Sequence, residues 1–211
     1  MNRSNNPWLS IPAADYEAHM ASPEVGQLQF LNKVFKETMA LRRPGSLLVA
    51  GCATGNGFEH VDFAVTKRVV AVDINPAYLI LLRERFRNVA KRIETVDKDI
   101  LACGFEPASF DLIFGGLIFE YIDASAALTR FRTWLKSDGI LAAVLQLPDD
   151  RLPKVTATSF ASLWSLAPVM KLRTGEAFDA AAATQGLVRV EAAVRCLTSG
   201  KRMYVASYAP R

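Results

Sequence analysis

The chain has 211 residues, of which 51% are hydrophobic, 22% charged and 9% aromatic, a composition typical of a folded globular protein. At roughly 100 to 200 residues per domain, this length predicts one domain with at most a small cap. The 25 basic and 21 acidic residues give a net charge of +4 that is spread along the chain. No run of basic residues indicates a nucleic-acid-binding arm.

The cysteines and the apolar segments indicate the cellular compartment of the protein. Cys52, Cys103 and Cys196 are an odd number without C-x-x-C spacing, which argues against a disulfide framework and a structural zinc site. Residues 2–6 are polar and lack the apolar stretch of a secretory signal. The longest apolar stretches run about ten residues, well short of the roughly 20 that cross a membrane. We expect a soluble, cytoplasmic protein without a membrane partner or a bound metal.

The N-terminal part of the sequence predicts two helices. A short helix is expected over residues 13–20. Ser22 and Pro23 then look like an N-cap followed by proline at the first helical position. Apolar residues recur at helical spacing beyond them, and Pro44 ends the segment.

From residue 46 onward, short apolar runs alternate with helical segments. Residues 46–50 and 69–72 are continuous apolar runs typical of buried parallel strands. A helix is expected between them over residues 58–66. Further strands are expected at 93–96, 110–114, 140–147, 186–188 and 203–208, and further helices after Asn75 and at 124–135. The alternation predicts an α/β fold with a mainly parallel sheet, closed at one edge by a hairpin turning at 198–201.

Two segments are expected to lie outside the sheet. Residues 1–45 are predicted to form an N-terminal helical lid on a domain that spans residues 46–211. Residues 148–185 are less regular and are interpreted as a crossover with a partial lid. Four of its residues would share one helical face: Phe160, Leu163, Trp164 and Ala167.

A glycine-rich loop follows the first predicted strand, where an open α/β sheet is expected to bind its ligand. Glycines let the backbone approach a ligand closely, and the start of a following helix presents free N–H groups to an anion. A carboxylate or a phosphate would fit this loop. Its residues are Gly51, Cys52, Ala53, Thr54, Gly55, Asn56 and Gly57.

Two acidic residues at later strand ends complete the candidate site. Asp73 lies about 20 residues after Gly51, the spacing at which a carboxylate accepts hydrogen bonds from ribose hydroxyls. Asp99 and Ile100 follow the third strand and suit an exocyclic amine and an adenine face. Asp97 competes with Asp99, which is preferred because it precedes an aliphatic residue. Together these positions predict an adenosine pocket.

Spacing argues against two common nucleotide sites. A dinucleotide fingerprint that starts at Gly51 would need glycines at Ala53 and Asn56, and one that starts at Gly55 would need a glycine at His60. No Gly-Lys-Ser or Gly-Lys-Thr of a phosphate-binding loop is present. The sequence therefore disfavours NAD binding and ATP hydrolysis.

Four segments in order resemble class I S-adenosylmethionine-dependent methyltransferases: residues 47–57, 70–76, 110–114 and 135–141. The resemblance implies a Rossmann-like three-layer sandwich with a seven-stranded, mainly parallel sheet whose last strand is antiparallel. It also implies S-adenosyl-L-methionine as cofactor and methyl transfer to an acceptor, for which we favour a small molecule. No catalytic residue is assigned.

The same resemblance implies the cofactor contacts. The loop from Gly51 to Gly57 would hold the methionine part, and Asp73 the ribose. The remaining contacts would be Ile74 and Ile100 on the adenine faces, Asp99 at the adenine amine, and Gly115, Gly116 and Leu117 beside the sulfonium. Two positions depart from the family pattern: Val49 replaces an acidic residue, and Ala53 replaces a middle glycine, where a positive φ would strain it.

Several other residues are open to a functional or a packing interpretation. His19 is a candidate base, which is needed only if the acceptor must lose a proton, whereas His60 is expected to pack or face solvent. Trp8 is a candidate to cover the site, and Tyr16 is a candidate to bind the methionine carboxylate. Glu120 and Tyr121 follow the fourth strand on the expected acceptor side, and Glu120 is equally plausible as an acid at a helix start.

The acceptor is not identified by any motif. After the fourth strand the chain lacks the Asn or Asp followed by Pro-Pro that is typical of enzymes methylating base amino groups. Phe160, Trp164, Met170 and Lys171 are either part of a pocket for a small, partly apolar acceptor or a core helix stripe. The alternatives are a non-catalytic cofactor-binding or regulatory module and an NAD-dependent oxidoreductase. The oligomeric state, a homo-oligomer included, is left open.

Overall fold

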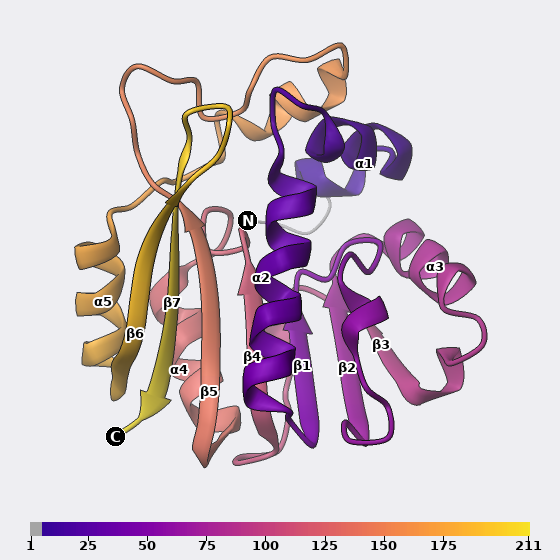
Figure 1. The fold of residues 1–211 in the computed structure, drawn as a ribbon, viewed down its shortest axis with the longest axis vertical. Helices are drawn as coiled ribbons and strands as arrows, with labels where there is room; N and C mark the ends of the chain where they lie inside the picture. Colours follow the sequence, from indigo (N-terminus) through magenta and orange to yellow (C-terminus); the bar gives the residue numbers. More distant parts are fainter. Residues whose placement is uncertain (1–5) are drawn as a thin grey trace.

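The computed structural model describes residues 6–211, so residues 1–5, which begin the predicted lid and include most of the polar start, lie outside the description. Seven strands form one sheet: β1 Ser46–Ala50, β2 Arg68–Asp73, β3 Ile93–Asp97, β4 Phe110–Gly116, β5 Leu135–Gln146, β6 Leu187–Cys196 and β7 Arg202–Pro210. Their order is β3-β2-β1-β4-β5-β7-β6 (Figure 1). Strands β1 to β5 pair in parallel, and β7 is antiparallel to both of its neighbours. The predicted sheet and its terminal hairpin are confirmed.

Helices cover both faces of this sheet. They are α1 Ala13–Ala21, α2 Gln27–Arg42, α3 Pro76–Arg85, α4 Ala124–Trp134 and α5 Gly175–Thr184, with short 3-10 turns η2 Pro7–Leu9, η3 Phe58–His60, η4 Ala90–Arg92, η5 Ile100–Ala102 and η6 Ala161–Leu166. Side chains alternate along a strand, so Leu47 and Val49 pack on the face with α2 and α3, and Leu48 and Ala50 on the face with α4 and α5. The result is a three-layer sandwich.

Two further segments pack over the carboxyl edge of the sheet, outside these three layers. Residues 7–25 and residues 147–174, here called the roof, meet above the ends of the central strands (Figure 1). Tyr16 and Met20 of α1 pack with Leu163 and Leu166 of η6 in one apolar cluster. The Ser162 hydroxyl donates to Asp15 at 2.6 Å, which adds a polar tie between the two segments.

Helix α2 belongs to the layered core. Phe35 is 1% exposed, and its ring centroid lies 5.0 Å from that of Phe114 in β4 and 6.1 Å from that of Phe58. Val34 and Met39 pack in the same cluster. The division of the chain at residues 45 and 46 stays a prediction.

The predicted helix over residues 58–66 is wrong, because the structure has only the turn η3 there. Asp62 accounts for the difference. Its carboxylate accepts the N–H of Ala64 at 2.8 Å, an Asx turn that competes with helix formation. Thr66 also donates its hydroxyl to the carbonyl of Pro44 at 2.8 Å, which turns the chain into β2.

The predicted start of the second helix is also wrong. Ser22 ends α1 and donates its hydroxyl back to His19 O at 3.0 Å, so it does not cap the next helix. Gly26, at φ 64°, turns the chain into α2, which begins at Gln27. A left-handed residue between two helices is a position that glycine fills without strain.

The crossover is more regular than expected. Helix α5 lies within it, capped by Thr174, whose hydroxyl accepts from Ala177 N at 3.2 Å. The predicted helical face of Phe160, Leu163, Trp164 and Ala167 is wrong, since η6 is a 3-10 segment in which Leu163 is buried while Trp164 is 54% exposed. Strand β5 begins at Leu135 and includes the turn expected before it. Within residues 6–211, no helix combines the length and hydropathy needed to cross a bilayer.

We predict that Phe35→Ala lowers the free energy of unfolding by about 3–5 kcal/mol, because it leaves a cavity between α2 and the sheet. Urea unfolding followed by circular dichroism measures this change. Lys36→Ala, at the next and exposed position, is the matched control and should change stability by less than about 0.5 kcal/mol. A loss for Phe35→Ala below about 1 kcal/mol would show that α2 is a detachable lid.

Candidate active site

A cavity of about 770 Å³ lies between the carboxyl edge of the sheet and the roof. Parallel strands end at one edge, so the segments that follow β1 to β4 all reach it. The residues of the predicted site that line this cavity are Gly51, Ala53, Asp73, Ile74, Asp99, Ile100, Gly116 and Leu117. Those outside its lining are Cys52, Thr54, Gly55, Asn56, Gly57 and Gly115. Asp97 is also outside, so the placement favours Asp99 over Asp97.

Asp73 joins the ends of two neighbouring strands. Its Oδ2 accepts the N–H of Ala53 at 2.8 Å, and its Oδ1 accepts the N–H of Asn75 at 2.9 Å. Burial raises the pKa of Asp73 to about 6, although these backbone donors act to lower it. Each carboxylate oxygen can accept about two hydrogen bonds, so the carboxylate retains acceptor capacity toward the cavity.

Asp99 and Ile100 lie beside Asp73 along the same edge. Asp99 accepts the N–H of Leu101 at 2.9 Å and so caps the short turn η5. Ile100 is 3% exposed and forms part of the cavity wall. This end of the cavity therefore combines two acidic side chains with an aliphatic surface.

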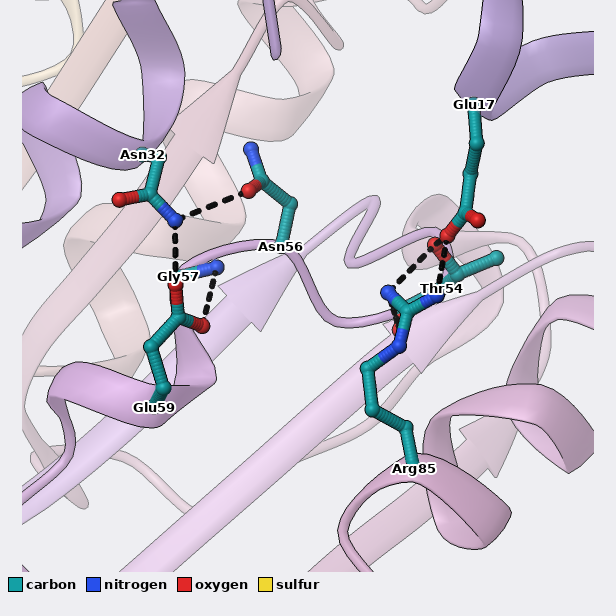
Figure 2. A network of polar contacts seen from close by, with 7 residues as sticks. All are labelled: Glu17, Asn32, Thr54, Asn56, Gly57, Glu59 and Arg85. Atoms are coloured by element: carbon teal, nitrogen blue, oxygen red, sulfur yellow. Dashed lines mark hydrogen bonds and ion pairs between the residues drawn. The ribbon is translucent and has the colours of Figure 1, made fainter. Parts of the chain in front are cut away.

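Three residues of the glycine-rich loop that do not line the cavity, Thr54, Asn56 and Gly57, anchor the loop instead (Figure 2). Glu17 of α1 accepts hydrogen bonds from the Thr54 hydroxyl and from Arg85 of α3, the latter at 2.6 Å. Arg85 also donates to the carbonyl of Thr54 at 3.2 Å. This network ties the roof to the loop and to the first helix after β2.

The far end of the loop is anchored to α2. Asn32 donates to Asn56 at 3.0 Å and to Glu59 at 2.5 Å, and Glu59 accepts the N–H of Gly57 at 3.1 Å (Figure 2). His60 Nε2 lies 2.9 Å from Asn32 Oδ1, and the residue is outside the cavity lining.

Aromatic residues line the roof side of the cavity. The ring centroid of Trp8 lies 5.9 Å from that of Tyr16 and 5.0 Å from that of Tyr121. Asn75 donates its side-chain amide to the carbonyl of Trp8 at 2.9 Å, which fixes η2 over the end of β2. Burial, with the nearby Asp73 carboxylate, raises the pKa of Tyr16 far above its ordinary value, so the phenol is neutral.

His19, one helical turn after Tyr16 in α1, also lines the cavity. Its Nδ1 lies 2.8 Å from the Thr158 hydroxyl. Burial, with a contribution from the ammonium of Lys201, lowers the pKa of His19, so the imidazole is neutral at pH 7. A neutral imidazole can accept a proton, which keeps His19 a candidate base.

Two cavity-lining residues have strained backbones. Ala53 has φ 45° and Leu117 has φ 56°, the left-handed region that favours glycine. Such strain persists only where the surrounding structure enforces it, and it is common at binding sites. Here the bond from Ala53 N to Asp73 and that from Leu117 N to Val144 O, at 2.9 Å, hold both residues in place.

Glu120 is buried behind the cavity lining at 1% exposure. Its Oε1 accepts the N–H of Gln146 at 2.7 Å, and within residues 6–211 its Oε2 has no hydrogen-bond partner. Burial raises the pKa of Glu120 to about 7, although the Gln146 amide and Arg173 act to lower it. The helix-start interpretation of Glu120 is wrong, because α4 begins at Ala124 and is capped by Asp123.

Sequence reasoning missed three residues at the remaining end of the cavity. Gln146, Lys154 and Lys201 line it, from the end of β5, from the roof and from the turn before β7. Lysine at a hairpin turn is ordinarily exposed. Its burial depends on how the hairpin meets the roof, which no local pattern predicts.

We predict that Glu120→Gln changes how stability depends on pH. The raised pKa of Glu120 adds stability that is present below its ordinary value of 4.5 and is lost as the pH rises through about 7. Between pH 4.5 and pH 7 the wild type should therefore lose stability relative to Glu120→Gln. The difference in unfolding free energy should shift in favour of the variant by up to about 3 kcal/mol. Urea unfolding across this pH range measures the gain. Exposed Glu106→Gln is the control, and parallel curves for Glu120→Gln and the wild type would contradict the assignment.

We predict that Ala53→Gly raises the free energy of unfolding by roughly 0.5–1 kcal/mol, because glycine relieves the positive φ. The matched control is Ala180→Gly in the middle of α5, which should lower it by about 1 kcal/mol. Chemical denaturation of the two variants compares the signs directly. A destabilised Ala53→Gly would show that the Ala53 methyl contributes more by packing than its backbone costs.

Comparisons with known proteins agree with the fold. An uncharacterised methyltransferase-like protein of Schizosaccharomyces pombe is 27% identical over 146 residues, which cover 69% of this chain and 54% of the relative. The chain thus spans about half the length of the curated relatives it matches.

Among solved structures, geranyl diphosphate C-methyltransferase from Streptomyces coelicolor, solved with Mg²⁺, geranyl diphosphate and S-adenosyl-L-homocysteine, superposes with a TM-score of 0.67 at 13% identity, covering 92% of this chain and 88% of that one. The cyclase SpnF superposes equally well, with a TM-score of 0.67 at 12% identity, covering 85% of this chain and 80% of that one. These likenesses confirm the Rossmann-like fold predicted from the sequence.

A family model described as a methyltransferase domain matches residues 29–143, more than half of the chain. The match begins in α2 and ends in β5, so it includes the glycine-rich loop, Asp73, Asp99 and the end of β4. It confirms the resemblance seen in the sequence motifs: the chain belongs to the methyltransferase domain family.

Proposed function

We propose that the chain is an S-adenosyl-L-methionine-dependent methyltransferase that acts on a small molecule. The observation that carries this proposal is the position of Asp73. Its carboxylate lies at the end of β2, lines the cavity and retains acceptor capacity beside Gly51 and Ala53. A carboxylate held in this way by backbone donors suits a pair of ribose hydroxyls.

The residues around Asp73 fit the rest of the cofactor. In the proposed arrangement Asp73 holds the ribose, Asp99 accepts from the adenine amine, and Ile74 and Ile100 cover the adenine. The methionine part lies along the loop of Gly51, Cys52, Ala53, Thr54, Gly55, Asn56 and Gly57, and Gly115, Gly116 and Leu117 border the sulfonium. Support comes from the S-adenosyl-L-homocysteine in the Streptomyces enzyme and from the cavity that eight of these residues line. The other loop residues and Gly115 lie outside the lining and would act by shaping the loop and the end of β4.

When bound, the sulfonium supplies an activated methyl group. The chain would then align the acceptor with it and exclude water, and such alignment supplies roughly 7–11 kcal/mol in favourable cases. The roof suits this role, because Trp8, Tyr16 and Tyr121 form an apolar wall over the cavity. An acceptor that must lose a proton would meet a neutral imidazole at His19.

The proposed acceptor is a small molecule because of the size of the site. About 770 Å³ holds a nucleoside cofactor and a modest second ligand, within the range of small-molecule sites.

We further propose a cytoplasmic protein, since Cys52 and Cys103 are buried free thiols and Cys196 is an exposed one.

A second candidate is a protein that binds the cofactor without transferring its methyl group. Ala53 favours it, because its methyl group stands on the loop where the family has glycine. The similarity in fold to a cyclase shows that this architecture occurs in proteins whose named reaction is not methyl transfer. Incubation with S-adenosylmethionine and a panel of acceptors separates the two candidates, since only the first forms S-adenosylhomocysteine.

We predict that Asp73→Asn weakens binding of S-adenosylhomocysteine by at least about tenfold, because a charged acceptor of hydroxyl groups is lost. Isothermal titration calorimetry measures the affinity. Asp138→Asn, an exposed position at the opposite edge of the sheet, should bind as the wild type does.

A second comparison separates ribose binding from a disturbed loop, because Asp73 also holds Ala53. The wild type should bind adenosine more tightly than 2′,3′-dideoxyadenosine, and Asp73→Asn should bind the two alike. If Asp73→Asn weakens both ligands by the same factor, the carboxylate supports the loop and does not hold the ribose.

A further inference from the structure

Lys201 is a buried cation at the end of the cavity farthest from Asp99. It is 5% exposed, precedes β7 and lines the cavity. Its Nζ donates to the carbonyl of Lys154 at 2.9 Å, and no carboxylate among the described residues forms an ion pair with it. An ammonium has three donors, so further hydrogen bonds from Nζ are available.

Other groups around Lys201 add positive charge or none. Lys154 Nζ donates to the carbonyl of Met170 at 2.8 Å, and Lys171 and Arg173 also line the cavity. Burial lowers the pKa of Lys201 to about 8, which leaves the ammonium mostly protonated at pH 7. His19 nearby is neutral.

Acidic groups lie elsewhere. Asp73 and Asp99 line the opposite end of the cavity, and the carboxyl group of Glu120 is turned to Gln146 N outside the lining. The strand order places β7 two positions beyond β4, about 10 Å at the usual strand spacing. The proposed sulfonium contacts lie at the end of β4. Lys201 therefore lies about two strand positions beyond them along the same edge of the sheet.

We propose that Lys201 is the centre of an anion-binding subsite that receives a carboxylate or phosphate group of the methyl acceptor. This inference rests on the proposed function and narrows its substrate class to anionic small molecules. A buried ammonium without a counter-ion costs free energy, and an anionic oxygen that accepts its free donors recovers it. The lysine would thereby hold the acceptor with its other end toward the end of β4.

The test compares Lys201→Met with Lys67→Met, an exposed lysine before β2 at the opposite edge of the sheet. Inorganic phosphate and acetate are titrated into each protein with S-adenosylhomocysteine bound, at an ionic strength fixed with sodium chloride. We expect Lys201→Met to bind the anions about tenfold more weakly than the wild type and Lys67→Met to be unchanged. The stronger of the two anions identifies the acceptor group. Equal affinity in Lys201→Met and the wild type would overturn the proposal.

The affinity for S-adenosylhomocysteine assigns the anion to the acceptor or to the cofactor. We expect Lys201→Met to bind it as the wild type does. If its affinity falls about tenfold, Lys201 holds the methionine carboxylate and the acceptor assignment is overturned. Lys201→Gln, which keeps a donor to Lys154 O but no charge, repeats both measurements should the methionine variant not fold.

Failure of the proposed function gives a different result. A wild type that does not bind S-adenosylhomocysteine contradicts the cofactor assignment and removes the acceptor role of Lys201. The same anion titrations without cofactor then still distinguish Lys201→Met from Lys67→Met. The two proposals can therefore fail separately.

Discussion

The arrangement of the site depends on one carboxylate. Asp73 ends β2 and accepts the amides of Ala53 and Asn75, so it joins the glycine-rich loop of β1 to the start of α3. These bonds are buried, where a carboxylate without donors would be costly. The loop geometry and the acidic group thus stabilise each other, and neither is present without the parallel pairing of β1 and β2.

The sequence predicted the parts of the molecule that follow from local patterns. Apolar runs identify strands such as β1 and β2 because both faces of a parallel sheet are buried. Asp73 and Asp99 line one cavity because parallel strands end at the same edge, which converts sequence order into spatial order. The helix prediction for residues 58–66 was wrong because the Asx turn at Asp62 competes with helix formation. The hydrophobic pattern carries no information about this turn.

Long-range contacts account for what could not be predicted. The roof forms because α1 meets η6 across more than 100 residues of chain, as in the bond between Asp15 and Ser162. Glu17 reaches Arg85 in the same way, and Lys201 is buried only when the hairpin and the roof are both in place. Val49, where the family has an acid, packs against α2 at 5% exposure, so its apolar character suits the layer that this chain builds.

The antiparallel direction of β7 also decides at which edge of the sheet this strand ends. Because β7 starts at the cavity and runs back along the sheet, Arg211 lies at the opposite edge (Figure 1). There its backbone N–H donates a hydrogen bond to the carbonyl of Gly186. The nine residues of β7 separate the two edges by about 30 Å at the usual rise per residue. The polypeptide that leaves β7 at Arg211 is therefore directed away from the ligand cavity, and a tether joined at this point would orient the binding face outward.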